Sequence, residues 1–198
     1  MLQRNAIAKA ALVCAALAAG GQASAAVYFG DTTGGPTYQR ALADFSGLSS
    51  VGTDVAYEVF DFSVDTGGLY SFLSVALKDA AGEKWDNYLF LYAGSFDPSA
   101  PLAAGVAGND DYFFGGGFGG VGFSGFSDVA LTTGVAYHLV TTGFDNDSFG
   151  SYLNIIRGAG EIIPAVPEPD RYAMLLAGLG AIGLATRRRL RRSAEQEE

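Results

Sequence analysis

The sequence has 198 residues, a single cysteine and a formal net charge of −9. Its middle part is more acidic than this figure suggests, because residues 26–165 contain four basic and sixteen acidic residues, a net charge of −12. A surface of this sign repels nucleic acid and bare anionic membranes, so neither is expected as a partner. Cations and neutral sugars are the ligands that it favours.

The first 25 residues have the pattern of a secretory signal peptide. Arg4 and Lys9 form its basic start, residues 10–19 its apolar core, and Ala23-Ser24-Ala25 an A-x-A cleavage site. Cys14 lies inside the apolar core, so the mature chain is predicted to contain no cysteine. Disulfides, thiol catalysis and thiolate metal sites are therefore not expected, and the protein is predicted to be exported.

Residues 26–165 predict one all-β domain, an antiparallel β-sandwich or jelly roll. Apolar residues alternate over residues 55–59 and again over 60–64, and the change of phase at Val59–Phe60 predicts a β-bulge. The other predicted strands are 69–77, 87–92, 135–141 and 151–156. The strand at 87–92 is apolar on both faces, so we expect it inside its sheet.

The body also resembles a known bacterial sandwich. A D-x-Y-L-x-L-Y motif, an Asn-Asp-Asp triplet and a later TTGFDN segment followed by GSY are similar to the bacterial pre-peptidase C-terminal domain, which occurs beside secreted peptidases. The matching residues lie within residues 53–158 and are Asp86, Tyr88, Leu89, Leu91, Tyr92, Asn109, Asp110, Asp111, Phe144 and Gly150. The resemblance implies a non-catalytic role in binding or in structure.

No catalytic residue is predicted. His138, the only histidine, lies in a predicted strand, and the sequence lacks the G-x-S-x-G of a nucleophile elbow. Residues 117–122 fit G-x-G-x-x-G, but no helix is predicted after them, so a dinucleotide is not expected. A Ser-His-Asp arrangement or a pair of carboxylates for glycoside hydrolysis stays open, so a secreted hydrolase is the third interpretation.

Two groups of residues are candidates for binding a ligand. Oxygen ligands that calcium prefers cluster at Asn109, Asp110, Asp111, Asp145 and Asp147, although such residues also form ordinary turns. Aromatic residues beside polar ones suit a sugar ring, and the candidates for carbohydrate are Trp85 and Tyr112, although core packing also explains such aromatics. Calcium is the only cofactor that the sequence suggests.

The C-terminal part reads Pro167-Glu168-Pro169, then an uncharged stretch at 172–186, then an arginine cluster that includes Arg187, Arg188 and Arg189. A helix of fifteen residues reaches about 22 Å, which is shorter than the roughly 30 Å hydrocarbon core of a bilayer. Arginine side chains that snorkel to the membrane interface can compensate for part of this difference in length. We therefore predict a short transmembrane helix over 172–186, with residues 193–198 as a cytoplasmic tail.

Taken together, residues 166–192 closely resemble the PEP-CTERM sorting signal of Gram-negative bacteria. The resemblance implies recognition by exosortase, a membrane-embedded enzyme thought to cut near Pro-Glu-Pro. It also implies a precursor that is anchored in the inner membrane facing the periplasm and is then delivered to the cell surface or the extracellular matrix.

The sequence therefore predicts an exported, exosortase-sorted and non-catalytic protein of the cell surface or matrix, associated with exopolysaccharide. A carbohydrate- or calcium-binding module is the alternative interpretation.

Overall fold

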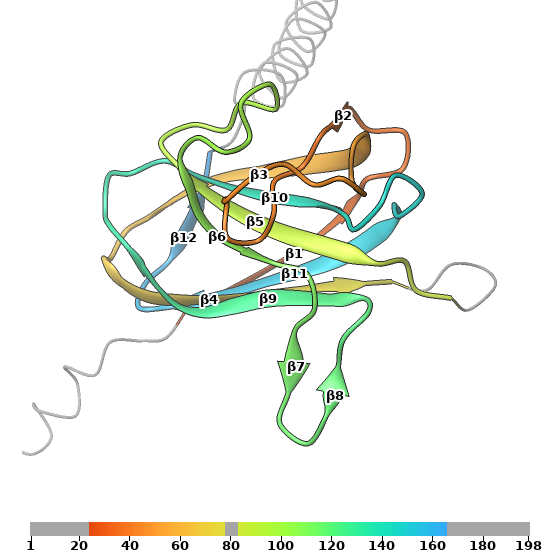
Figure 1. The fold of residues 1–198 in the computed structure, drawn as a ribbon. Coiled ribbons are helices and arrows are strands. Elements are labelled where there is room, and N and C mark those ends of the chain that lie inside the picture. The colour runs from red at the N-terminus through yellow and green to blue at the C-terminus, as the bar shows by residue number, and fades with distance from the viewer. Residues whose placement is uncertain (1–23, 78–82, 166–198) are drawn as a thin grey trace, which may run out of the picture. The chain divides into compact units, whose positions relative to one another are not determined.

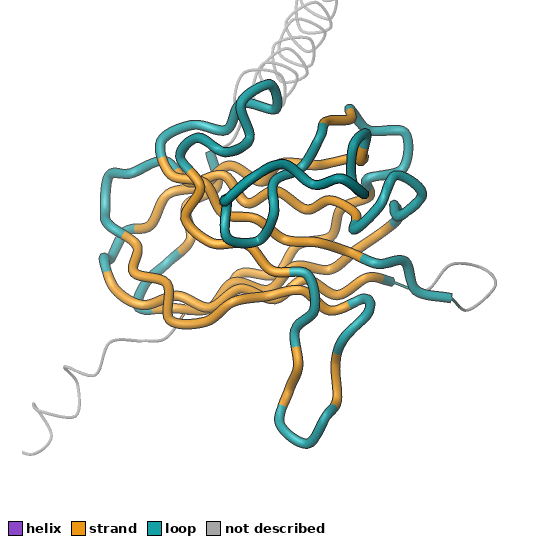
Figure 2. The backbone as a smooth tube through the Cα atoms, in the orientation of Figure 1, coloured by secondary structure: helices purple, strands orange, loops and turns teal. Residues whose placement is uncertain are grey.

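The computed structural model describes residues 24–77 and 83–165, and Figure 2 shows strands and loops along them. None of these residues forms a helix long and apolar enough to cross a membrane. The chain divides into two compact units, residues 1–164 and 165–198. Most of the predicted signal peptide and the whole predicted transmembrane helix lie outside the described residues.

The first unit contains a four-stranded antiparallel sheet, the lower layer in Figure 1. Its strands lie in the order β1-β11-β4-β9. They are β1 (Ser24–Asp31), β11 (Ser151–Gly158), β4 (Gly68–Ala76) and β9 (Phe123–Leu131). Because β1 begins at Ser24, a cut after Ala25 would leave residues 26–31 of this strand in the mature chain.

The upper layer in Figure 1 is a six-stranded antiparallel sheet in the order β12-β3-β10-β5-β6, with β2 paired to β3. Its strands are β12 (Ile162–Pro164), β3 (Val55–Val64), β10 (Tyr137–Gly143), β5 (Asn87–Ala93), β6 (Gly105–Asn109) and β2 (Thr37–Tyr38). A short hairpin of β7 (Phe113–Phe114) and β8 (Phe118–Gly119) projects beyond the lower layer.

The long strands follow the order of a jelly roll. Among the described residues eight strands have five residues or more, and in chain order the first, eighth, third and sixth form the lower sheet. The second, seventh, fourth and fifth form the upper one. This is the arrangement of a double-sheet jelly roll, so the predicted all-β antiparallel class is confirmed.

The main core lies between the two sheets. Phe62 of β3, Leu91 of β5 and Leu139 of β10 meet Phe72 of β4 and Ile156 of β11 in one buried cluster. Inward-facing residues from both layers therefore exclude water together, as in other sandwiches. This shared core makes the two sheets one domain.

A second apolar cluster covers the other face of the six-stranded sheet. Phe90 and Tyr92 of β5 and Val140 of β10 pack there against Tyr38 and Ala41 of the chain that follows β1. Figure 2 shows loops gathered on that side of the sheet. The strand β5 is buried on both faces and lies between β10 and β6, as its apolar sequence predicts.

The predicted β-bulge at Val59–Phe60 is wrong. The strand β3 pairs with β10 in continuous register from Tyr57 to Phe62. The apolar residues change phase because the strand has two buried faces. Its second half points Phe62 into the core, whereas its first half points Val55 into the second cluster.

Candidate functional site

The outer face of the four-stranded sheet is an apolar surface. Residues that point away from the core line up across the strands in two rows, Val27–Ile155–Leu73 and Phe29–Leu153–Val75–Phe123. Val27 is 56% exposed and Phe29 is 72% exposed. Contiguous exposed apolar patches commonly mark binding surfaces, so this face is a candidate for one.

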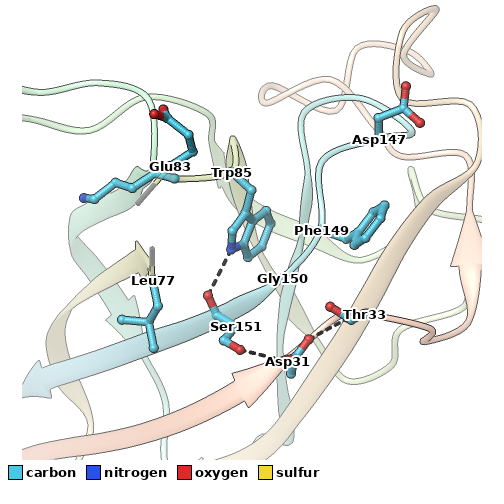
Figure 3. Close-up of a pocket in the computed structure, with 10 residues that line it drawn as sticks. Asp31, Thr33, Leu77, Glu83, Trp85, Asp147, Phe149, Gly150 and Ser151 are labelled. Carbon is cyan, nitrogen blue, oxygen red and sulfur yellow. Dashed lines mark hydrogen bonds between the residues drawn. The ribbon is translucent and has the colours of Figure 1, made fainter. Parts of the chain in front are cut away.

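A cleft lies at one end of this outer face, where β1 and β4 end and β11 begins. We call it the Trp85 cleft, and its volume is about 440 Å³. Figure 3 shows the Trp85 ring at its centre, with Phe149 to one side and the polar residues of β1 and β11 below. The residues that line it include Asp31, Thr33, Leu77, Glu83, Trp85, Asp147, Phe149 and Ser151.

The indole of Trp85 is held in a fixed position. Its Nε1–H donates to the backbone carbonyl of Ser151 at 2.9 Å. Gly150 lies against the ring, and a Cβ built at this glycine would lie 2.8 Å from Cδ1 of Trp85. A glycine is therefore needed at this position for the backbone to approach the ring so closely.

The polar side of the Trp85 cleft is built around Asp31. This carboxylate accepts a hydrogen bond from the Ser151 hydroxyl at 2.6 Å and another from the Thr33 backbone N–H at 2.8 Å. These hydrogen bonds, the one from Ser151 first, hold the pKa of Asp31 below its ordinary value. An ionised carboxylate beside two aromatic rings can accept hydrogen bonds from the hydroxyl groups of a ligand.

A second groove lies farther along the same outer face, where the hairpin strands meet the sheet. We call it the Tyr112 groove, and its volume is about 280 Å³. Its lining residues are Ser71, Phe72, Leu73, Tyr112, Phe114, Ser127, Ile155 and Arg157. The Tyr112 ring packs over Gly125 of β9 and makes an edge contact with Phe114.

The two aromatic residues predicted to bind carbohydrate therefore do not share a cleft. Trp85 lies in the first cleft and Tyr112 in the second, and both open on the outer face of one sheet. Sequence reasoning did not select Asp31, Phe149 or Ser151 for the first cleft, or Arg157 for the second. The continuous run of apolar residues from Ala25 to Phe29 could have revealed β1, but nothing local shows that it pairs with β11.

The residues predicted to bind calcium make different contacts in the structure. The side chain of Asn109 accepts a hydrogen bond from the Gly125 N–H, and that of Asp145 accepts from the Ser148 hydroxyl and the Asp147 N–H. Asp147 lines the Trp85 cleft. Within residues 24–77 and 83–165, no group of three or more acidic or histidine side chains is placed to hold a metal ion. The calcium site stays a prediction.

Asp110 and Asp86 are nevertheless unusual carboxyl groups. Each has a buried Oδ1 atom without a hydrogen-bond partner. Burial, and then the nearby charges of Asp86 and Asp111, raise the pKa of Asp110 to about 6. Burial and the charge of Asp111 also raise the pKa of Asp86. Among the charged neighbours of Asp110, Asp86 raises its pKa the most.

His138 pairs with a carboxylate but lies apart from both clefts. Its Nδ1 is 2.6 Å from Oδ1 of Asp61 on the neighbouring strand β3, and its Nε2 is buried without a partner. Neither residue lines the Trp85 cleft or the Tyr112 groove. Among the described residues no serine hydroxyl bonds to His138, so that part of the chain does not assemble a Ser-His-Asp site there.

The predicted sorting residues, from Pro167 to Arg189, lie outside the described residues. Comparison with protein families nevertheless decides their identity, because the family described as the PEP-CTERM protein-sorting motif matches residues 165–189. The chain carries a PEP-CTERM sorting motif. This motif implies an exported protein that exosortase, a membrane enzyme, recognises and processes to the cell surface. The match covers the tail and says nothing about the sandwich.

Comparisons of the whole chain with curated proteins and with solved structures do not identify the function of the sandwich. No curated protein matches it. The K1 cleaved adhesin domain of Lys-gingipain from Porphyromonas gingivalis W83 aligns at 15% identity and a TM-score of 0.34, over 71% of this chain and 99% of that one. The K3 cleaved adhesin domain of the same protein aligns at 14% and 0.33, over 68% and 91%.

A structure of carbohydrate-binding modules from the β-sandwich superfamily aligns at 14% identity and a TM-score of 0.28, over 73% of this chain and 58% of that one. TM-scores this low say nothing about function, so the site must be interpreted from its own residues.

Proposed function

We propose that this is a non-catalytic surface protein that exosortase sorts and that binds extracellular polysaccharide through the Trp85 cleft. The sorting motif supports the first part, because it implies a protein that is exported and processed to the cell surface. The fixed indole of Trp85, with Phe149 and ionised Asp31 in the same cleft, supports the second part.

The chemistry of the Trp85 cleft suits a sugar better than an apolar ligand. Ligand sites combine aromatic walls with a few well-placed polar groups, and their volumes are commonly about 300–1,000 Å³. The Trp85 cleft has this size, and it offers Asp31 and Ser151 beside the ring. A sugar presents an apolar ring face together with hydroxyl groups, so it can contact the aromatic and polar parts at once.

The state of Asp31 argues against a role as the general acid of a glycosidase. The general acid of a glycosidase needs a raised pKa, so that it still holds a proton at neutral pH. The hydrogen bonds from Ser151 and Thr33 shift the pKa of Asp31 in the opposite direction. Asp31 is therefore suited to accept hydrogen bonds from a ligand and unsuited to protonate a leaving group.

The single tryptophan of the chain provides a direct test. We expect exopolysaccharide from the producing strain to change the fluorescence of the full chain, purified in detergent, because Trp85 is the only indole that can report. In a pull-down with the same polymer, Trp85→Ala should bind at least tenfold more weakly than the unchanged chain.

Leu102→Ala is the matched control, because Leu102 is an exposed apolar residue that lines neither cleft. It should bind like the unchanged chain. Equal binding by Trp85→Ala and Leu102→Ala would remove the Trp85 cleft from the proposal. Release of reducing sugar from the polymer would contradict the non-catalytic part.

A further inference from the structure

Arg157 is the basic residue of the Tyr112 groove. It lies on the outer face of β11, where it pairs across the sheet with Ala25 of β1 and Ser71 of β4. The other residues that line the groove are aromatic, aliphatic or hydroxyl-bearing, and none of them is acidic. A positive charge therefore lies in this groove without a built-in counter-ion.

The other described basic residues of the body are engaged differently. Arg40 is buried and donates its hydrogen bonds to backbone carbonyl groups. The ammonium group of Lys84 lies 3.5 Å from the centre of the Phe123 ring. Arg157 is exposed, and among residues 24–77 and 83–165 no carboxylate lies within ion-pair distance of it. In a body of net charge −12, the exposed guanidinium of Arg157, without an ion pair to any of these residues, is available to an anionic ligand.

The neighbours of Arg157 narrow the class of anion. A guanidinium forms two parallel hydrogen bonds to a carboxylate, a geometry that an ammonium group cannot match. Ser71, Ser127 and Tyr112 supply hydroxyl groups in the same groove, and Phe114 supplies an aromatic wall. Carboxylate, hydroxyl groups and an apolar ring face occur together in an acidic sugar such as a uronic acid.

We propose that the Tyr112 groove is a subsite for a carboxylate-bearing sugar unit, and that Arg157 binds the carboxylate. This inference rests on the proposed function, because the two clefts then hold different units of one polymer. Arg157 and Ser151 are six positions apart on β11, a separation of about 20 Å along an extended strand. The apolar rows of the outer face lie between them.

The charges at the two ends of this surface set the placement of the polymer. The Trp85 cleft is lined by three acidic residues, Asp31, Glu83 and Asp147, and by one basic residue, Lys84, so its excess of negative charge disfavours a carboxylate. The Tyr112 groove contains Arg157 and no acidic residue. An acidic unit is therefore directed to the groove, whereas a neutral unit can occupy the Trp85 cleft.

Polygalacturonate and the same polymer with its carboxyl groups reduced to alcohols are the probes for this inference. Binding to the full chain in detergent is measured with a chelator present and at about 0.1 M salt, which screens the general repulsion from the acidic body. We expect the unchanged chain to bind polygalacturonate about tenfold more tightly than the reduced polymer, because a charge-assisted pair is lost on reduction.

Arg157→Gln should remove this preference, so that the variant binds the two polymers alike. Arg157→Lys should keep part of it, because the charge remains while the two parallel hydrogen bonds are lost. Thermal melting of both variants should match that of the unchanged chain, which shows that the fold is intact.

The outcomes separate this inference from the proposed function. If the unchanged chain binds both polymers equally and Trp85→Ala weakens both, the polysaccharide site stands and the acidic subsite is overturned. If neither polymer binds while exopolysaccharide from the producing strain does, the acidic subsite is overturned and the proposed function stands. If polyglutamate binds as tightly as polygalacturonate, the groove recognises carboxylates without the sugar, and the inference is again overturned.

Discussion

The guanidinium of Arg40 donates two hydrogen bonds to the backbone carbonyl of Phe144, from Nε at 3.0 Å and from Nη2 at 2.7 Å. Its Nη1 donates to the carbonyl of Ala41, and its carbon atom Cζ lies 4.2 Å from the centre of the Tyr88 ring. Arg40 is 2% exposed, so these contacts are made away from water. One side chain therefore joins the chain after β2 to the chain after β10.

Replacing Arg40 should destabilise the domain strongly. Arg40→Leu leaves the Phe144 carbonyl without these donors, and we expect a loss of about 3 kcal/mol in the free energy of unfolding. Chemical denaturation of the purified chain measures it. Arg157→Gln serves as the control, because an exposed arginine without an ion pair should change the value by less than about 0.5 kcal/mol. Similar losses in both variants would contradict the bridging role of Arg40.

The raised pKa of Asp110 predicts that this carboxyl group stabilises the domain in mild acid. An aspartate in the unfolded chain has a pKa near 3.9, whereas burial and the neighbouring carboxylates raise that of Asp110 to about 6. The folded state then holds a proton that the unfolded state releases. The resulting stabilisation is complete below about pH 4 and is lost as the pH rises through about 6.

Unfolding measured at pH 5 and pH 7 should therefore differ between the unchanged chain and Asp110→Asn. We expect the variant to lack about 1 kcal/mol of the stabilisation gained on going to pH 5, a value reduced for solvent screening because the carboxyl group is partly exposed. An identical pH dependence in the two proteins would show that Asp110 keeps an ordinary pKa.

Calcium should act on the same carboxyl groups. If a cation binds near Asp110, it relieves the repulsion from Asp86 and Asp111 and raises the melting temperature at neutral pH. The gain in free energy follows the ratio of calcium to its dissociation constant and reaches about 2.7 kcal/mol at a hundredfold excess. Asp110→Asn should remove the effect. No shift at millimolar calcium, measured against chelator, would leave these residues as turn formers.

Gly150 should control the position of the indole in the Trp85 cleft. Gly150→Ala places a Cβ against Cδ1 of Trp85, so we expect the ring to move, its fluorescence maximum to shift and polysaccharide affinity to fall. Gly134→Ala is a matched control. Its glycine also has a positive φ, but a Cβ there meets no atom within 4 Å. Both variants introduce backbone strain, and only the first should change the fluorescence of Trp85.

Glu168 should be needed for sorting. In a host that carries exosortase, Glu168→Ala should accumulate as unprocessed precursor in the membrane fraction, which immunoblotting against the sandwich detects. Asp170→Ala removes a carboxylate just outside Pro167-Glu168-Pro169 and should be processed normally. Normal processing of Glu168→Ala would show that the motif does not depend on its acidic residue.

The sequence predicts strands well where local alternation and a buried face coincide. Four of the predicted strands correspond to β4, β5, β10 and β11, and the strand predicted over 55–64 corresponds to β3. The strands β1 and β9 were not predicted. Phe123–Leu131 follows a glycine-rich stretch, and its pattern is interrupted where its register with β4 shifts.

The clefts were harder to predict because their residues meet only through the fold. Trp85 was selected for its residue type, but its partner Ser151 is 66 positions away and Asp31 is 120 positions from Ser151. Arg157 becomes a candidate ligand-binding residue only once the structure shows that none of the described residues lining its groove is acidic. Spacing along the chain contains no signal for such pairs.

The pairing of β1 with β11 also decides when the domain can fold. Residues 24–31 pair with residues 151–158. The first strand of the sandwich therefore cannot pair until one of the last strands is available. An exported chain emerges from its N-terminal side, and β1 is then unpaired until nearly all of the body has crossed the membrane. Its residues Ala26 and Tyr28, which pack against the core in the folded domain, stay exposed until then. Such long-range pairing is slow, and an open strand can aggregate in the meantime. We therefore expect this topology to keep the chain unfolded during translocation and to make its yield depend on periplasmic chaperones.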